Sequence, residues 1–287
     1  MSRVVYVNGS YRPWREAMVH AEDRGFQFGD AVYEVCEVRG GRLVDEARHM
    51  DRLERSLGEL AIPSPMSRPA WARVLRETIR RNRVADGSVY LQVSRGVARR
   101  EFLFPKAGTP PTVVCLARPA GRASAEAKAA AGIAIVTRPD PRWERCDIKT
   151  VMLLPASLAK EAAKKDGAGE VWFTDGDGAV TEGGSSNAWI VTREGHLVTR
   201  PASHAILRGI TRTTLLDVLA REGLKLEERA FTVAEALEAR EAFITSATNI
   251  VMPVVRIDGR AVGNGAPGSL SLRLREIFHE VAAISEP

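Results

Sequence analysis

The feature that most constrains how this chain folds is a stretch near its middle, residues 118–132, where the apolar patterning stops. It holds Pro119, Gly121 and a string of alanines separated by single charges. This composition is typical of a connection between domains, with room for one helical turn after Ser124. A chain of 287 residues is also longer than one ordinary core requires. We therefore expect two domains, 1–118 and 132–287, joined by an interdomain connection at 119–131.

Strand and helix patterns are mixed in both parts. In the first part we predict strands at 4–7, 31–38, 88–94 and 112–116, and helices at 46–60 and 71–82. In the second part we predict strands at 133–137, 171–174, 188–191 and 243–245, and helices at 155–165, 211–221, 233–239 and 270–282. The pattern indicates a mixed α/β protein (α+β mixed), with a small N-terminal α/β domain and a larger C-terminal domain around a mixed β core.

Composition excludes several classes of protein. Hydrophobic residues make up 45% and charged residues 27% of the chain, which is ordinary globular composition and excludes extensive disorder. The net charge of +5 comes from 41 basic and 36 acidic side chains spread along the whole sequence. So mild an excess is typical of a solvated surface with a site for an anionic ligand. We expect no nucleic-acid partner.

The cysteines and the N-terminus indicate the compartment. Cys36, Cys115 and Cys146 are odd in number and far apart, which argues against a disulfide framework or a zinc site. The five histidines show no paired ligand spacing, so we expect no metal. No run approaches the roughly 18 apolar residues of a membrane helix, and no apolar signal segment follows the start. We expect a soluble, cytoplasmic protein with no membrane partner.

Lys149 is the first candidate catalytic residue. It lies in RCDIKT (residues 145–150), within the short apolar segment 146–152. A lysine there either extends its amine to solvent or is held inside for the chemistry of that amine. A desolvated lysine near cations loses its proton more easily, which formation of a Schiff base and later proton transfer both require.

Glu182 is the second candidate. It lies in VTEGGSSN (residues 180–187), between a turn and a glycine- and serine-rich run. Taken singly, it can be a surface carboxylate. Beside a pyridine ring, its negative charge would keep the ring nitrogen protonated, so that the ring absorbs the electrons of a substrate carbanion. Gly183 and Gly184 would let the backbone approach a flat ring.

A possible phosphate site begins at Leu207. The segment LRGIT (residues 207–211) leads into a helix, and the unpaired amides at a helix start attract anions, here next to the Thr211 hydroxyl. Arg52, on the predicted helix 46–60, can add a bidentate phosphate contact. Each signal alone is weak, because glycine often precedes a helix and Arg52 can be one charge among several.

Two further segments carry polar groups. TSATN (residues 245–249) ends a strand with a small loop that offers more donors, although such loops usually just turn the chain. In the strand 31–38, alternation places Tyr33 with Ala31 and Val35 on one face and Glu34 on the other. A tyrosine in a strand is more often a core residue than a catalytic one.

Together these segments match one family in their order, their spacing and their local sequence. The chain resembles the fold type IV pyridoxal-phosphate enzymes, the group that includes branched-chain aminotransferases, and most closely the D-amino acid (D-alanine) aminotransferases. The resemblance runs from YVNG (residues 6–9) to PVVRIDG (residues 253–259). DRGFQFGDAVYEV (residues 23–35) and RCDIK (residues 145–149) carry it most specifically.

The resemblance implies a two-domain fold with pyridoxal 5'-phosphate in the cleft, and a homodimer whose active site is completed across the interface. Lys149 would be the Schiff-base lysine and proton shuttle in a D-amino acid transamination that runs through a pyridoxamine form, with 2-oxoglutarate or pyruvate as acceptor. The implied cofactor-binding residues are Arg52, Lys149, Glu182, Leu207, Ile210, Thr211, Ser246 and Ala247. The implied substrate-binding residues are Tyr33, Val35, Arg100 and Phe102, with Arg100 reaching the α-carboxylate from the other subunit.

Two positions depart from the family pattern. Phe102 stands where the family's carboxylate trap has a histidine, so the trap loses one donor, and Ala247 replaces a threonine and offers only its amide. Either Arg99 or Arg100 compensates, or the enzyme accepts less charged substrates such as (R)-amines. The alternatives are a branched-chain L-aminotransferase, an (R)-amine transaminase, an aminodeoxychorismate lyase or a non-enzymatic cofactor-binding protein.

Overall fold

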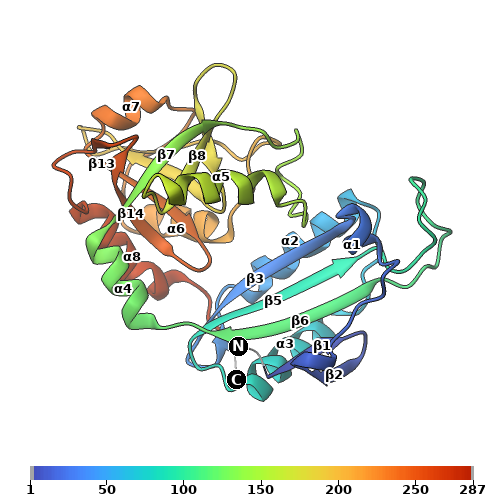
Figure 1. Ribbon diagram of the computed structural model, residues 1–287. Coiled ribbons are helices and arrows are strands. Elements are labelled where there is room, and N and C mark those ends of the chain that lie inside the picture. Colours follow the sequence, from blue (N-terminus) through green and yellow to red (C-terminus); the bar gives the residue numbers. More distant parts are fainter. Residues whose placement is uncertain (1–2, 286–287) are drawn as a thin grey trace. The chain divides into compact units, whose positions relative to one another are not determined.

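The computed structural model describes residues 3–285, which divide into two compact units (Figure 1). The first unit contains the chain up to residue 122 together with the short segments 148–152 and 283–285. The second contains residues 123–147 and 153–282. The segment that carries Lys149 therefore belongs to the first unit, although it interrupts the sequence of the second.

The first unit is a six-stranded antiparallel sheet with two long helices on one face. The strand order is β2-β1-β6-β5-β3-β4. The strands are β1 (Val4–Val7), β2 (Ser10–Pro13), β3 (Ala31–Arg39), β4 (Arg42–Leu43), β5 (Gly87–Ser94) and β6 (Thr112–Pro119). Helices α2 (Glu46–Glu59) and α3 (Arg68–Asn82) contribute Leu53, Leu57, Trp71 and Leu75 to the core. A 3-10 turn η1 (Trp14–Glu16) and the short helix α1 (Arg24–Phe28) precede β3.

Alternation along β3 decides which side chains face this core. Val32, Cys36 and Val38 belong to the core cluster, and Glu34 lies buried on the same face. Tyr33 and Val35 point to the opposite face and are half-buried, because successive side chains of a strand point to opposite sides. Tyr33 is therefore not a residue of the helix-covered core.

The second unit is built on a nine-stranded mixed sheet. Its order is β12-β11-β10-β13-β14-β7-β8-β9, with β15 paired to β14. The strands are β7 (Ile133–Pro139), β8 (Glu170–Thr174), β9 (Val180–Gly183), β10 (Asn187–Val191), β11 (Leu197–Thr199), β12 (Leu226–Glu228), β13 (Glu241–Ser246), β14 (Ile250–Ile257) and β15 (Arg260–Ala261). Strand β7 runs parallel to both β8 and β14. The helices are α4 (Arg122–Ala131), α5 (Leu154–Lys165), α6 (Ile210–Arg221), α7 (Val233–Glu238) and α8 (Ser269–Val281).

The predicted mixed α/β fold is confirmed, and the predicted helices and strands are present with ends shifted by a few residues at most. The alanine-rich connection differs. Instead of one helical turn it forms the ten-residue helix α4, because alanine has the highest helix propensity and Ala129 is buried in the core of the second unit. Strand β14 was not predicted, since Pro253 interrupts its pattern. It pairs with β7 only from Val254 onward, so Pro253 needs no amide hydrogen on that side.

Candidate active site

Lys149 lies beside strand β3. Val32 and Thr150 form an antiparallel bridge, and the Tyr33 amide donates to the Lys149 carbonyl at 3.0 Å. The side chain is half-buried, and its Nζ lies 4.3 Å from the centre of the Tyr33 ring. The structure thus brings together the lysine and the tyrosine that the sequence had singled out separately, and the amine lies against an aromatic face rather than in open solvent.

Arg52 is fixed by a buried carboxylate. Its Nε and one terminal nitrogen donate to the two oxygens of Glu34 at 2.7 and 2.8 Å, and His49 Nδ1 lies 2.7 Å from the same carboxylate. Burial alone would raise the pKa of Glu34, but the Arg52 guanidinium and the hydrogen bonds from Arg52 and His49 outweigh it and lower this pKa to about 2. Arg52 is only 9% exposed, so it is not one solvated charge among several on α2.

Glu182 is the third residue of β9 and a buried carboxylate, 4% exposed. Arg142 donates to its Oε1 at 2.6 Å, and the Asn187 amide group and the Leu207 backbone amide donate to its Oε2 at 2.9 and 3.1 Å. These donors favour the ionised form. The alternative reading of Glu182 as a surface carboxylate therefore does not describe this position.

Arg142 itself is held in place by neighbours within the second unit. It forms two further hydrogen bonds to the Asp140 carboxylate, at 2.9 and 2.7 Å, and its guanidinium lies 4.8 Å from the centre of the Phe173 ring. Burial alone would lower the pKa of Arg142, but Asp140 and Glu182 outweigh it and raise this pKa. Sequence reasoning missed Arg142 because it lies 40 positions before Glu182.

The start of helix α6 lies next to Glu182. Asn187 donates both to Glu182 and, at 2.9 Å, to the Leu207 carbonyl, so it ties β9 and β10 to the segment that enters the helix. The N-cap is Gly209, which carries no side chain to satisfy the first amides of the helix. A Cβ added there would lie 2.1 Å from Asn187 Oδ1, so any other residue would displace the Asn187 side chain. Ile210 and the buried Thr211 follow as the first two helical residues.

Ser246 ends strand β13, and Ala247 begins the turn to β14. The Ser246 hydroxyl accepts a hydrogen bond from the Asn249 amide at 3.2 Å, which closes this turn. Thr245 turns away from it, because the Trp189 ring nitrogen donates to the Thr245 hydroxyl in the core. The Ser246 hydroxyl is thus engaged within the turn, so an anion bound here would be contacted by backbone amides, such as those of Ser246 and Ala247.

The predicted substrate residues fall into two groups. Tyr33 and Val35 share the half-buried face of β3, where Tyr33 stacks on Tyr90 with ring centres 5.6 Å apart. Arg100 and Phe102 lie on the loop between β5 and β6, and Phe102 is 80% exposed. Phe28 packs against both Phe102 and Arg100, because its ring lies 5.9 Å from the Phe102 ring and 5.3 Å from the Arg100 guanidinium.

Buried charges anchor the base of this loop. Arg24 and Arg95 both donate to Asp30 at 2.7 Å, and Arg24 also donates to the Glu101 carbonyl at 2.6 Å. The Arg95 guanidinium packs 3.7 Å from the centre of the Phe104 ring. Arg95 is therefore a structural residue of the loop, whereas Arg100 lies on its exposed part.

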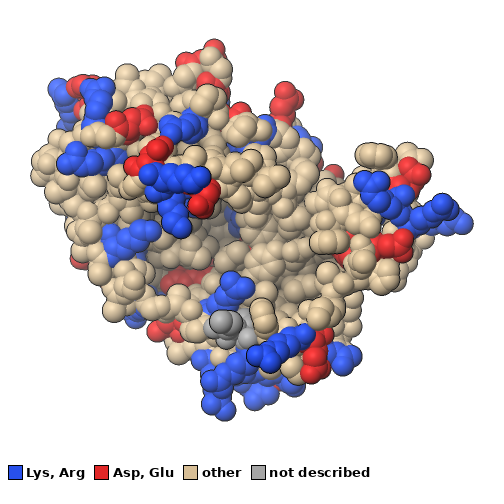
Figure 2. Space-filling view, in the orientation of Figure 1, with Lys and Arg blue, Asp and Glu red and all other residues tan. Residues whose placement is uncertain are grey.

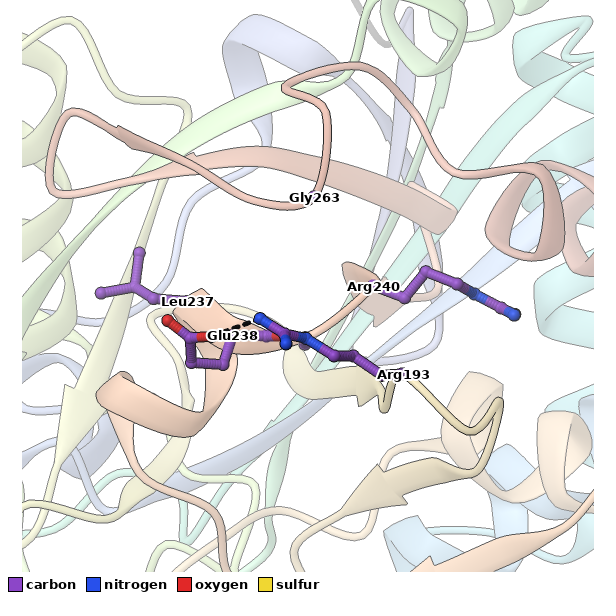
Figure 3. A pocket seen from close by; sticks show the side chains of 6 residues that line it. Arg193, Leu237, Glu238, Arg240 and Gly263 are labelled. Carbon is purple, nitrogen blue, oxygen red and sulfur yellow. Dashed lines mark hydrogen bonds and ion pairs between the residues drawn. The ribbon is translucent and has the colours of Figure 1, made fainter.

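One further hollow lies in the second unit, apart from the residues described above. On the face shown in Figure 2, Lys and Arg side chains are interspersed with Asp and Glu over much of the surface, and Lys and Arg gather at the bottom of the view. An open hollow of about 340 Å³ is lined by Arg193, Leu237, Glu238, Ala239, Arg240 and Gly263. Figure 3 shows Arg193 paired with Glu238 there, while Arg240 extends away from the pair. The hollow lies at the N-terminal end of β13, whereas Ser246 ends that strand. The length of β13 places these two ends about 17 Å apart.

The chain is similar to known proteins over most of its length. The family described as "Amino-transferase class IV" matches residues 31–257. D-alanine aminotransferase of Bacillus licheniformis is 40% identical, with 93% of each chain covered. The enzyme of the same name from Staphylococcus haemolyticus is 36% identical, with 96% of each chain covered.

Solved structures show the same fold. The branched-chain amino acid aminotransferase of Escherichia coli superposes with a TM-score of 0.90 at 24% identity, covering 98% of this chain and 95% of that one. A hypothetical aminotransferase from Mycobacterium tuberculosis in its PLP-bound form gives 0.85 at 26% identity, covering 97% and 98%. The chain therefore belongs to the class IV amino-transferases, a family of pyridoxal-phosphate enzymes with the fold type IV architecture.

Proposed function

We propose that this protein transaminates D-amino acids of the D-alanine type, with a 2-oxo acid such as pyruvate or 2-oxoglutarate as acceptor. The observation that carries the proposal is the position of the Lys149 amine, 4.3 Å from the centre of the Tyr33 ring on the half-buried face of β3. Near-full-length similarity to D-alanine aminotransferases supports it.

The residues present fit pyridoxal 5'-phosphate. The uncapped start of α6, the Thr211 hydroxyl and the amides of Ser246 and Ala247 suit the phosphate, with Leu207 and Ile210 beside them. Arg52 adds a guanidinium that is already oriented by Glu34. The buried carboxylate of Glu182 suits the pyridine nitrogen, and the Lys149 amine suits the aldehyde.

When bound, the cofactor supplies a carbonyl carbon for the substrate amine and a protonated ring that absorbs the electrons released at the substrate Cα. Lys149 Nζ would take the proton from that Cα and hold it for return, acting first as general base and then as general acid. Glu182 would keep the ring nitrogen in its protonated form. Its own charge is maintained by Arg142, Asn187 and the Leu207 amide.

Substrate binding requires groups that orient Cα toward Lys149. Tyr33 and Val35 lie on the lysine's side of β3 and are proposed to contact the substrate. Arg100 is proposed to bind the α-carboxylate, which a guanidinium pairs with in a bidentate manner. Together these contacts would decide which enantiomer directs its Cα proton toward Nζ.

We propose that a homodimer completes the site, with Arg100 of one copy serving the active site of the other. Exposed large apolar side chains in the first unit support this proposal, because their burial against a second copy would remove apolar surface from water. They are Trp14, Met18, Val19, Phe26, Phe102, Leu103 and Phe104, which are 46–80% exposed.

An (R)-amine transaminase is the second candidate, because a specific observation favours it. Phe102 replaces a polar residue of the family pattern and packs edge-to-face against Phe28. This loop therefore offers an aromatic surface beside Arg100, which suits an amine with an aromatic group in place of a carboxylate.

We also propose a cytoplasmic location. Cys36, Cys115 and Cys146 are free thiols, as proteins of a reducing compartment usually have. In residues 3–285, no helix is both long and apolar enough to cross a membrane.

The test is a single half-reaction. Purified holoenzyme is mixed separately with D-alanine, L-alanine, L-leucine and (R)-1-phenylethylamine, and the change in the cofactor's visible absorbance is followed by stopped flow. We expect D-alanine to react about 100-fold faster than L-alanine or more, because the wrong enantiomer points its Cα proton away from Lys149. Faster reaction of either L-amino acid would overturn the stereochemical assignment, and fastest reaction of the amine would favour the second candidate.

A further inference from the structure

Ile250, the first residue of β14, has an unusual backbone conformation. Its φ is +59°, in the left-handed region, and its side chain is 6% exposed. A β-branched residue is rarely found there, because its side chain crowds the neighbouring carbonyl. The residue directly follows the turn 247–249, and we propose the amides of Ser246 and Ala247, where this turn begins, as phosphate donors.

Arg275 on α8 contacts both carbonyls that flank Ile250. One terminal nitrogen of its guanidinium donates to the Asn249 carbonyl and, at 2.8 Å, to the Val251 carbonyl. In an extended strand, carbonyls two residues apart are about 6.8 Å apart. One nitrogen within hydrogen-bond distance of both keeps them within about 6 Å. The pair of contacts therefore favours a folded backbone at Ile250 over an extended one.

The other edge of the guanidinium is also held. Arg275 Nε and its second terminal nitrogen donate to Glu126 on α4 at 2.8 and 3.1 Å, and Arg275 is 8% exposed. Figure 1 shows α4 and α8 beside β14 in the second unit. Because a guanidinium is planar, pairing one edge with Glu126 orients the other edge toward the two carbonyls.

We propose that Arg275 is a positioning residue for the cofactor phosphate: it holds Ile250 in the left-handed conformation and so aims the Ser246–Ala247 amides. The Ser246 hydroxyl closes the turn at one end by accepting from Asn249, and Arg275 fixes the other end. This inference rests on the proposed function, in which that turn binds phosphate.

The test compares two ligands of the apoprotein. Dissociation constants are measured for pyridoxal 5'-phosphate and for pyridoxal, which has the same aldehyde but no phosphate. Arg275→Ala is expected to weaken the phosphorylated ligand about tenfold and pyridoxal less than twofold, because only the phosphate meets the turn. Arg273→Ala, on the same helix but 63% exposed in its side chain and paired with Glu222, is the matched control and should change neither constant.

A second substitution tests the link to Ile250. Glycine adopts the left-handed region without crowding, so Arg275→Ala should cost less than threefold in an Ile250→Gly background. Arg275→Lys keeps the charge but loses the planar guanidinium with its several donors. In the protein that keeps Ile250, it should weaken pyridoxal 5'-phosphate binding by less than Arg275→Ala does. If Arg275→Ala does not fold, Arg275→Lys takes its place in the measurements with Ile250 and with Ile250→Gly.

The outcomes separate the two proposals. Equal weakening of both ligands by Arg275→Ala, or the same tenfold loss in the glycine background, overturns the role of Arg275. Ala247→Pro removes one amide of the turn itself. If it leaves the preference for the phosphorylated ligand unchanged, the turn is not a phosphate site and that part of the proposed function fails, whatever Arg275 does.

Discussion

The candidate cofactor residues and the candidate substrate loop differ in how completely the chain holds them. Glu182 is 4% exposed and accepts from Arg142, Asn187 and the Leu207 amide, and Arg52 is fixed by Glu34. Arg100 lies on an exposed loop beside Phe102, which is 80% exposed. A site that binds its cofactor before the substrate arrives needs this rigidity on the cofactor side.

The single chain thus holds the candidate cofactor residues in place, whereas the exposed part of the candidate substrate loop has few contacts of its own. The loop's base is rigid, because Arg24 and Arg95 pair with the buried Asp30. Its exposed aromatic side chains remain available for a partner. This difference supports the proposal that a second copy of the chain covers the loop. Variants of the candidate cofactor residues and of the loop test it separately.

Removing the lysine gives the largest expected effect. Borohydride fixes pyridoxal phosphate to the amine that carries it, so mass spectrometry of the reduced protein locates the attachment. We expect the adduct on Lys149 and its complete loss in Lys149→Ala, because an alanine side chain has no amine. Lys160→Ala, which removes a lysine paired with Glu170 in the second unit, should keep the adduct. An adduct that persists in Lys149→Ala would show that another residue carries the cofactor.

Neutralising Glu182 comes next. Glu182→Gln keeps the shape but removes the charge, so kcat with D-alanine should fall about 100-fold or more. Arg142→Gln should reduce kcat less, because Asn187 and the Leu207 amide still hold the carboxylate. Steady-state kinetics on both variants measures the ranking. A change in kcat below twofold for Glu182→Gln would show that this carboxylate does not serve the cofactor ring.

The buried ion pair that holds Arg52 should make stability depend on acid pH. The pKa of Glu34 is lowered from 4.5 to about 2 in the folded protein. Its stabilising contribution is therefore complete above pH 4.5 and is lost as the pH falls toward 2, by up to about 3 kcal/mol. Thermal melts between pH 6 and 2.5 measure this loss.

Two variants interpret those melts. Glu34→Gln should flatten the acid dependence, because glutamine does not titrate. Glu54→Gln should leave the acid dependence almost unchanged, because Glu54 lies on the helix that carries Arg52 but pairs with Arg68 at the surface. If Glu34→Gln melts with the same acid dependence as the unmodified protein, the ion pair does not hold Arg52 through charge.

The smallest effect is expected in the substrate loop. Phe102→His adds one donor beside Arg100, so KM for D-alanine should fall about fivefold with little change in kcat. Phe26→His, which alters another exposed aromatic of the first unit, serves as control. An unchanged KM would show that the carboxylate is bound by Arg99 or Arg100 without that donor.

The sequence predicted those parts of the fold and the site that depend on local pattern. Lys149 and Glu182 stand in distinctive segments, and α2 follows from the spacing of Met50, Leu53 and Leu57. The pairing of Glu34 with Arg52 and His49 was missed, because it depends on how α2 packs on β3. Arg142 and Arg275 were missed for the same reason, since each acts on residues about 25 to 40 positions away.

Chain topology set a further limit. No local signal shows that residues 148–152 join the first unit while the residues on both sides belong to the second. That placement depends on a bridge between Val32 and Thr150, more than a hundred residues apart. Long-range pairings of this kind are decided by the packing of the whole unit rather than by propensity.

The central claim, that each active site joins Lys149 of one copy to Arg100 of another, is tested most directly by complementation. Lys149→Ala and Arg100→Ala proteins, each nearly inactive alone, are mixed, allowed to exchange subunits, and assayed with D-alanine. Random exchange makes half of the dimers mixed, each with one intact site, so activity should return to about a quarter of the unmodified enzyme's. Activity no higher than the average of the two parents, with subunit exchange verified, would contradict the claim.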